Sequence, residues 1–215
     1  MRKLTLLFFW LGTAAFAQKG SFELGLSAGI NSAKVSNADD QSFLKVDSKY
    51  GLNIGLSADY FLTDHWSVKT MLAYDEKGLD GHFSRRPLDQ ASGFAFRDIN
   101  SDFKLTYLTV PVTVNRHFGK TFDFSIGLGG YVGFLLDSNE EDHQLLFGMS
   151  RNFSETDFGV VGTILVKYPL ASKVKIGLQY EFQQGLSELY NPNPASSPQH
   201  YNSRHNLSVG CYYVL

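Results

Sequence analysis

The sequence predicts an all-β protein, an eight-stranded antiparallel up-and-down transmembrane β-barrel, and three observations support this fold class. Apolar and polar residues alternate with a period of two in one segment after another. The connections between these segments are short and long in turn, and aromatic residues recur near the segment ends. A barrel suits this pattern because closure leaves no strand edge unpaired inside a bilayer.

The first residues have the features of a secretory signal peptide. Two basic residues precede an apolar run over residues 4–11 and the small-residue site Ala15-Phe16-Ala17. The run is too short to cross a bilayer as a helix, so an uncleaved anchor is the weaker alternative. We expect cleavage after Ala17, which gives a signal peptide over residues 1–17 and a barrel domain over residues 18–215 in the bacterial outer membrane.

Composition excludes several classes of protein. The chain has 19 basic and 21 acidic residues, a formal net charge of −2, and no nucleic-acid partner is indicated. Cys211 is the only cysteine, so an intramolecular disulfide is impossible, and no cysteine near the cleavage site could carry a lipid anchor. We expect no cofactor, with outer-membrane lipid as the surrounding partner.

Eight segments are predicted to be strands with one apolar and one polar face. In the first, Leu24 and Leu26 share one face, whereas Glu23 and Ser27 share the other. In a barrel in a membrane, the apolar faces contact lipid and the polar faces line the interior. The predicted strands span residues 21–32, 50–62, 65–75, 103–114, 122–136, 158–168, 174–182 and 205–215.

The fourth predicted strand is irregular. Its apolar residues occupy odd positions up to Tyr107 and even positions from Leu108 onward. We interpret this change as a phase slip, most simply a β-bulge near Tyr107. Pro111 has no N–H to donate to a ladder, so it also predicts a local distortion.

The connections alternate in length. Long connections on one side and short turns on the other are typical of outer-membrane barrels, and an even strand number places both termini on the short-turn, periplasmic side. The short connections are residues 63–64, 117–120 and 169–172, and the long ones are residues 33–49, 76–102, 137–156 and 185–204.

Aromatic residues on the apolar faces gather at two heights, as expected where they lie at the two membrane interfaces. A soluble β-sandwich or a lipocalin-like barrel would share the alternation but gives no reason for this double girdle. One set is Tyr60, Trp66, Phe122, Tyr168 and Tyr213, and the opposite set is Tyr74, Phe134, Phe158 and Phe182.

Four segments carry a resemblance to a known family. They are Tyr107-Leu108-Thr109-Val110-Pro111-Val112, Gly129-Gly130-Tyr131-Val132-Gly133, Asp157-Phe158-Gly159 and residues 180–186. With them the sequence resembles the PorT-like outer-membrane β-barrel family over essentially the whole mature chain, the Tyr-Leu-x-Val-Pro stretch being the most specific part. The resemblance implies a barrel, and the family's namesake implies a link to protein export across the outer membrane. Its motif positions in this chain are Tyr107, Leu108, Pro111, Gly129, Gly130 and Gly133.

Charged residues on the predicted inner faces are expected to form a network that fills the barrel. Eight strands enclose a space that side chains can just fill, and buried ions persist when they are paired. A proton or ion path through the same residues is the alternative. The predicted network comprises Glu23, Asp59, Lys69, Asp123, Lys167, Lys173 and Lys175.

Candidate catalytic and metal-binding residues are few. His65 and Ser67 share a strand face, but no nucleophile motif surrounds them, and we expect both to be wall residues. The acidic run Glu140 to His143 is expected to be a solvated loop surface. We therefore expect a non-enzymatic outer-membrane scaffold or partner-binding protein that contacts other envelope proteins. A lipid-modifying enzyme is the alternative, and a narrow pore is a weaker one.

Overall fold

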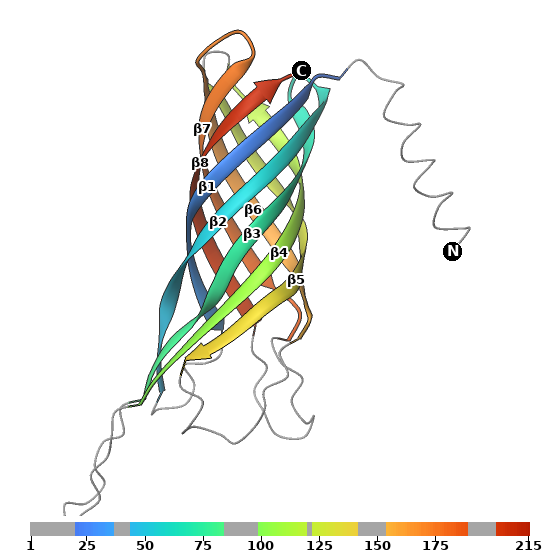
Figure 1. The fold of residues 1–215 in the computed structure, drawn as a ribbon. Coiled ribbons are helices and arrows are strands. Elements are labelled where there is room, and N and C mark those ends of the chain that lie inside the picture. Colours follow the sequence, from blue (N-terminus) through green and yellow to red (C-terminus); the bar gives the residue numbers. More distant parts are fainter. Residues whose placement is uncertain (1–19, 37–43, 84–98, 120–121, 142–153, 189–200) are drawn as a thin grey trace, which may run out of the picture.

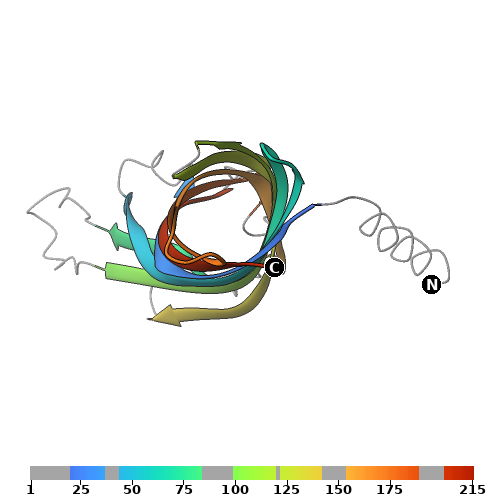
Figure 2. The same cartoon turned by 90° about the horizontal axis from the view of Figure 1, so that it is seen from above.

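The computed structural model describes residues 20–36, 44–83, 99–119, 122–141, 154–188 and 201–215, and these residues form the predicted closed antiparallel barrel (Figure 1). Each strand pairs with the next along the chain, and the last pairs with the first, as the view along the barrel shows (Figure 2). The expected signal peptide lies outside the described residues. The strands are β1 (Phe22–Ser36), β2 (Leu44–Thr63), β3 (Trp66–Phe83), β4 (Ile99–Phe118), β5 (Asp123–Glu141), β6 (Thr156–Pro169), β7 (Val174–Gly185) and β8 (Tyr201–Val214).

The alternation along each strand separates an apolar outer surface from a polar interior. Leu26 and Leu128 are 56% and 71% exposed, whereas Glu23 and Ser67 are buried. Exposed apolar area costs about 25 cal/mol per Å² in water, so this surface requires the hydrocarbon of a bilayer. No helix among the described residues is long and apolar enough to cross a membrane.

The start of β1, the end of β8 and the β2–β3 and β6–β7 turns lie at one end of the barrel (Figure 1). We call this end the turn end and the opposite end the loop end. Exposed aromatic side chains occur near both ends, in agreement with the predicted double girdle. They include Trp66, Tyr168 and Tyr213 near the turn end, and Tyr74, Phe134 and Phe158 toward the loop end.

The strands at the loop end are longer than predicted. β2 begins at Leu44, β3 continues to Phe83 and β5 continues to Glu141, so the predicted loops were too long. Beyond the bilayer, neither face of a strand must be apolar, and the ladder therefore continues where the alternation ends. The outer parts of β2 to β5 form an extension that reaches past the ends of the other strands (Figure 1).

The irregularity predicted near Tyr107 is present, but its form differs from the prediction. The β4–β5 register shifts between Thr106 and Tyr107, which pair with Asp137 and Leu135, so the extra residue is Leu136 in β5. β4 itself keeps one phase: Leu105 and Tyr107 are both buried in the interior. The sequence pattern changes because the inward-facing positions 105 and 107 of β4 carry apolar residues. The strand does not change which of its alternate positions face the interior.

Pro111 distorts the wall as predicted. The β3–β4 register continues on both sides of this point, but the pairs Met71–Pro111 and Leu72–Val110 are missing from it. Proline has no N–H to donate to the Met71 carbonyl. Its own carbonyl accepts a hydrogen bond from the Thr70 hydroxyl at 3.2 Å. An outward-facing depression of about 290 Å³ lies beside this seam and is lined in part by Leu56, Met71 and Val110.

A cation placed at mid-height on the outer surface should impair assembly. Leu178 is 51% exposed near the middle of β7, and Leu170 is 58% exposed in the β6–β7 turn. Leu178→Arg should cost ~2 to 4 kcal/mol, whereas Leu170→Arg should cost about 0 to 1 kcal/mol at the interface. The measurement is the fraction of heat-modifiable, folded protein after refolding into lipid vesicles. Equal folded fractions for the two variants would contradict the assigned orientation.

The revised strand ends define which loop residues can be removed. Replacing residues 189–200 with a short Gly-containing turn should leave heat-modifiable migration intact, because loop closure costs little free energy. Replacing residues 185–204 should lower the folded fraction, since this change also removes the buried Asn202 and Arg204. Equal tolerance of both replacements would show that the start of β8 is dispensable.

Candidate functional site

At the turn end, the inward-facing charges form one ion-paired group, the turn-end cluster. Lys167 Nζ lies 2.5 Å from Glu23 Oε1, 3.3 Å from Asp123 Oδ2 and 3.9 Å from Asp59 Oδ2. Lys175 Nζ lies 2.7 Å from Glu23 Oε2 and 3.7 Å from Asp123 Oδ2. The cluster therefore joins residues from β1, β2, β5, β6 and β7 across the barrel. Lys167, which is fully buried, contacts carboxylates from three of these strands.

Two further residues of the predicted network lie in different surroundings. Lys69 is buried, lies opposite Asp59 in the β2–β3 ladder, and donates to Gln179 Oε1 at 2.6 Å. Lys173 was wrongly predicted to point inward. It is exposed in the β6–β7 turn, where strand alternation does not apply, and its Nζ lies 5.7 Å from the centroid of the Tyr213 ring.

A Ser-His-Asp chain adjoins the turn-end cluster. Ser67 Oγ lies 2.8 Å from His117 Nε2, and His117 Nδ1 lies 2.8 Å from Asp123 Oδ1. His65, the partner considered from the sequence, is instead exposed in the β2–β3 turn. These distances match those of hydrolytic triads, but Ser67 is 0% and His117 is 4% exposed. A substrate carbonyl therefore has no approach to the hydroxyl in this structure.

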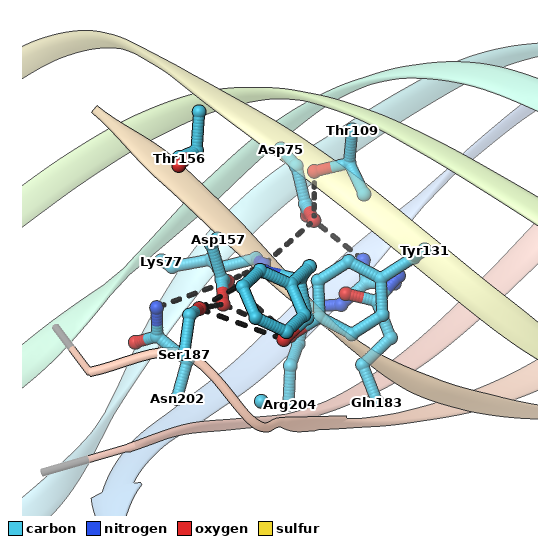
Figure 3. Close-up of polar contacts among 12 residues, drawn as sticks. Asp75, Lys77, Thr109, Tyr131, Thr156, Asp157, Gln183, Ser187, Asn202 and Arg204 are labelled. Carbon is cyan, nitrogen blue, oxygen red and sulfur yellow. Dashed lines mark hydrogen bonds and ion pairs between the residues drawn. The ribbon is translucent and has the colours of Figure 1, made fainter. Parts of the chain in front are cut away.

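A second group, the loop-end cluster, is built around Asp157 at the start of β6 (Figure 3). Lys77 Nζ lies 3.0 Å from Asp157 Oδ2, and both side chains are almost fully buried. Tyr131 Oη at 3.2 Å, Ser187 Oγ at 3.0 Å and Asn202 Nδ2 at 3.1 Å also donate to this carboxylate. A carboxylate with several donors and a cation is well compensated for its loss of water.

The motif segments of the sequence meet at Lys77. Its ammonium lies 5.0 Å from the Tyr107 ring centroid and 4.9 Å from that of Tyr131, within cation–π range. A Cβ on Gly133 would lie 3.4 Å from the Tyr107 ring, and one on Gly185 would lie 3.2 Å from Asp157 Oδ1. Three of the separated motif segments therefore surround the Lys77 ammonium, and the fourth lies against Asp157 through Gly185.

The other motif positions shape the wall. A Cβ on Gly129 would lie 1.9 Å from the Val112 carbonyl oxygen, so only glycine fits this close approach of β5 to β4. A Cβ on Gly130 would meet nothing closer than 3.4 Å. Leu108 lies on the outward-facing positions of β4, and Pro111 forms the seam described above.

Arg204 connects the loop-end cluster to the middle of the barrel. Its guanidinium pairs with Asp75 at 2.8 Å and with Glu181, whose other oxygen accepts from Gln179 at 3.2 Å. Because Gln179 also accepts from Lys69, hydrogen bonds and ion pairs run from the loop-end cluster to Lys69, which lies opposite Asp59 of the turn-end cluster in the β2–β3 ladder. A cavity of about 10 Å³, lined in part by Lys69, Gln179 and Glu181, leaves room for about one water molecule.

The interior charges nearly balance. Five cations face six carboxylates, so the described interior has a formal charge of −1 with His117 counted as neutral. A nearly neutral set of buried ions avoids the large cost of an uncompensated charge. The cations are Lys69, Lys77, Lys167, Lys175 and Arg204, and the carboxylates are Glu23, Asp59, Asp75, Asp123, Asp157 and Glu181.

This arrangement fills and neutralises the barrel. The described residues contain no group of three or more His, Cys, Asp or Glu side chains placed to hold a metal ion. Of the acidic run considered from the sequence, Glu140 and Glu141 belong to β5, and the next two residues lie outside the described residues.

The loop-end cluster and the role of His117 were not predicted from the sequence. Lys77 and Arg204 fell in segments predicted as loops, and His117 fell in a predicted turn. Strand parity offered a signal, because His117 and Asp123 occupy inward-phase positions on either side of the β4–β5 turn.

Breaking the Lys77–Asp157 pair should destabilise the barrel. Asp157→Asn leaves the buried Lys77 ammonium with Asp75, 4.0 Å away, and should cost about 3 kcal/mol. The double variant Lys77→Met, Asp157→Asn should recover most of this loss, because no unpaired charge then remains. Urea unfolding in lipid vesicles measures both. A double variant less stable than the single one would mean that packing around Lys77, and not its charge, is decisive.

Comparison with known proteins agrees with this fold. The structure is similar to the outer membrane protein OprG of Pseudomonas aeruginosa, with 15% identity, a TM-score of 0.55 and coverage of 91% of this chain and 95% of that one. It is similar to the outer membrane protein W of E. coli, with 17% identity, a TM-score of 0.52 and coverage of 93% and 100%. A major outer membrane protein of Thermus thermophilus gives 12% identity, a TM-score of 0.54 and coverage of 92% and 100%.

These likenesses, at low identity, show the fold alone. A search of curated proteins finds no match to the sequence. The model of the outer membrane protein beta-barrel domain family matches residues 16–191, which is most of the chain. Together with the closed barrel and its apolar outer surface, this match shows that the chain belongs to the outer membrane protein beta-barrel domain family.

Proposed function

We propose that this protein is a non-catalytic component of the bacterial cell envelope, an integral outer-membrane scaffold that binds partner proteins through its loop-end extension. The observation that carries the proposal is the filled interior. Paired side chains occupy the barrel from the turn-end cluster to the loop-end cluster, with a mid-barrel cavity of only about 10 Å³. A filled barrel leaves the outside of the molecule to interact with other molecules.

The extension favours interaction on the extracellular side. Strands β2 to β5 continue beyond the ends of β6 and β7, so a structured surface stands away from the membrane. Rigid strands position a binding surface better than loops alone do. Within this proposal, the PorT-like assignment is the finer family identity and suggests a role linked to protein export, with envelope proteins as partners.

One observation favours a second candidate function, that of a lipid-modifying enzyme. The Ser67–His117–Asp123 chain has the contacts of a nucleophile, a general base and an orienting carboxylate. Its burial argues against catalysis, since an acyl group would have to enter the filled turn end. A fluorophosphonate probe, which labels activated serines, tests this directly.

We expect no labelling of folded protein by the fluorophosphonate, because Ser67 is inaccessible. The matched control is Ser67→Ala, which should give the same background and should show the same absence of phospholipid hydrolysis. Labelling that Ser67→Ala removes, accompanied by lipid hydrolysis, would replace the scaffold proposal by an enzymatic one.

Purified protein in planar bilayers should show no sustained single-channel steps, since paired ions and packed side chains block the interior. Lys69→Ala and Lys175→Ala serve as matched tests. Lys69 is buried at mid-barrel, and Lys175 is partly exposed at the turn end. Stable wild-type conductance whose ion selectivity changes in these variants would identify a pore.

Partner binding itself is tested by cross-linking in intact cells followed by identification of the captured envelope proteins. The variant replaces residues 84–98, which connect β3 to β4, by a short turn, and the control replaces residues 189–200. We expect the first replacement to lose specific partners while both variants keep heat-modifiable assembly. Unchanged capture in both variants would contradict a role for the extension.

A further inference from the structure

The outer part of β5 has an open edge in the described part of the chain. β5 pairs with β6 up to Phe134, opposite Thr156, and the Leu135 N–H donates to the Glu155 carbonyl at 2.9 Å. Beyond the bulge residue Leu136, residues 137–141 of β5 pair with β4 alone, as far as the pair Asp102–Glu141. On the side away from β4, no described strand lies against residues 136–141.

The backbone direction at this edge follows from the neighbouring ladder. The His117 N–H donates to the His65 carbonyl at 2.8 Å, so odd-numbered residues of β4 direct their backbone groups toward β3. Even-numbered residues of β4, such as Lys104, therefore face β5, where Lys104 pairs with Asn139. It follows that Ser138 and Glu140 direct their N–H and C=O groups to the open edge.

Such an edge is a template for another strand. Unpaired backbone donors and acceptors in a row allow an extended segment to add to a sheet, and proteins commonly block such edges with lysine or proline. Residues 136–141 read Leu-Asp-Ser-Asn-Glu-Glu and contain neither. The other outer strand of the extension, β2, carries Lys45 in its corresponding part, residues 44–48.

Charge identifies the kind of strand that fits. In sequence, three of the six residues 136–141 are acidic, namely Asp137, Glu140 and Glu141, and Asp102 pairs with Glu141 in the β4–β5 register. Lys104 Nζ is 2.7 Å from Glu76 Oε1, so this neighbouring cation is already paired. A second copy of the same edge would bring like charges together, whereas a basic segment would be attracted.

We propose that the β5 edge over residues 136–141 binds a basic, extended polypeptide segment of another protein by strand addition. This inference rests on the proposed partner-binding function and specifies the chemistry of the partner. Main-chain hydrogen bonds to Ser138 and Glu140 hold the added strand, and its basic side chains select it over neutral or acidic segments.

The test uses the full chain, folded in detergent micelles, and a defined fluorescent peptide, Thr-Lys-Val-Lys-Thr-Lys-Thr, capped at both ends. Fluorescence anisotropy should show saturable binding that weakens as salt is added. A peptide of the same sequence, N-methylated at two consecutive central amides, keeps its charge but loses donors on both edges. It should bind at least tenfold more weakly, and a peptide with glutamate in place of lysine should not bind.

Variants of the protein locate the site. Ser138→Pro removes an edge donor and obstructs the added strand, yet leaves the β4–β5 ladder intact, because Ser138 points away from β4. It should reduce binding at least tenfold, while the control Ser138→Ala should bind as the wild type does. Both variants should keep heat-modifiable migration, which shows that the barrel has assembled.

Several outcomes would overturn the inference. Equal binding of the methylated and unmethylated peptides would show simple charge attraction, and full binding to Ser138→Pro would place the site elsewhere. Absence of peptide binding would mean that the edge is not a binding site. No peptide binding, together with partner capture that still depends on residues 84–98, would reject strand addition but keep the proposed partner-binding function. No peptide binding, together with partner capture that does not depend on these residues, would reject both proposals.

Discussion

The rest of the structure depends on the requirement that backbone N–H and C=O groups inside hydrocarbon be hydrogen-bonded. No water is available there, so each strand between the interfaces must have a neighbour on both sides. The pairing of β8 with β1 meets this requirement by closing the ladder. Closure then fixes the phase of every strand, because a slip of one residue would turn a lipid-facing leucine such as Leu178 into the polar interior.

Pro111 is a local exception that the wall accommodates. It interrupts the β3–β4 ladder at Met71, yet the ladder resumes at Ala73–Thr109. The Thr70 hydroxyl donates a hydrogen bond to the Pro111 carbonyl beside this interruption. The motif stretch around Pro111 therefore combines a weakened seam with Tyr107, which faces inward and covers Lys77. One short segment serves both the wall and the interior.

The interior shows why a small barrel can contain so many ions. Removing a charge from water is expensive, but each buried cation here faces at least one carboxylate from another strand. Lys167 joins β6 to β1, Lys77 joins β3 to β6, and Arg204 joins β8 to β3. These pairs link strands that are distant around the ring, so they specify how opposite walls face each other, which ladder bonds between neighbours cannot do.

The sequence predicted the features that depend on local periodicity. The polar or apolar character of alternate positions, seen at Glu23 and Leu24, placed most interior and lipid-facing residues without any knowledge of tertiary structure. The loop-end cluster was harder to predict from the sequence. Lys77 and Arg204 lie where the outer face of the strands no longer has to be apolar, so the alternation ends there. Lys173 was misplaced because strand phase does not extend into a turn, and the bulge was misassigned because Leu105 and Tyr107 are apolar residues inside a polar barrel.

The same hydrogen-bonding requirement explains why the extension can have an open edge. Within the membrane an unpaired row of backbone groups would be prohibitive, but above it water satisfies them at little cost. The outer ends of β2 and β5 are therefore free to end at different heights from β1 and β6. Backbone groups that water satisfies can exchange water for another strand, whereas those of the closed wall cannot. The physical rule that seals the barrel thus permits strand addition only where the sheet has left the bilayer.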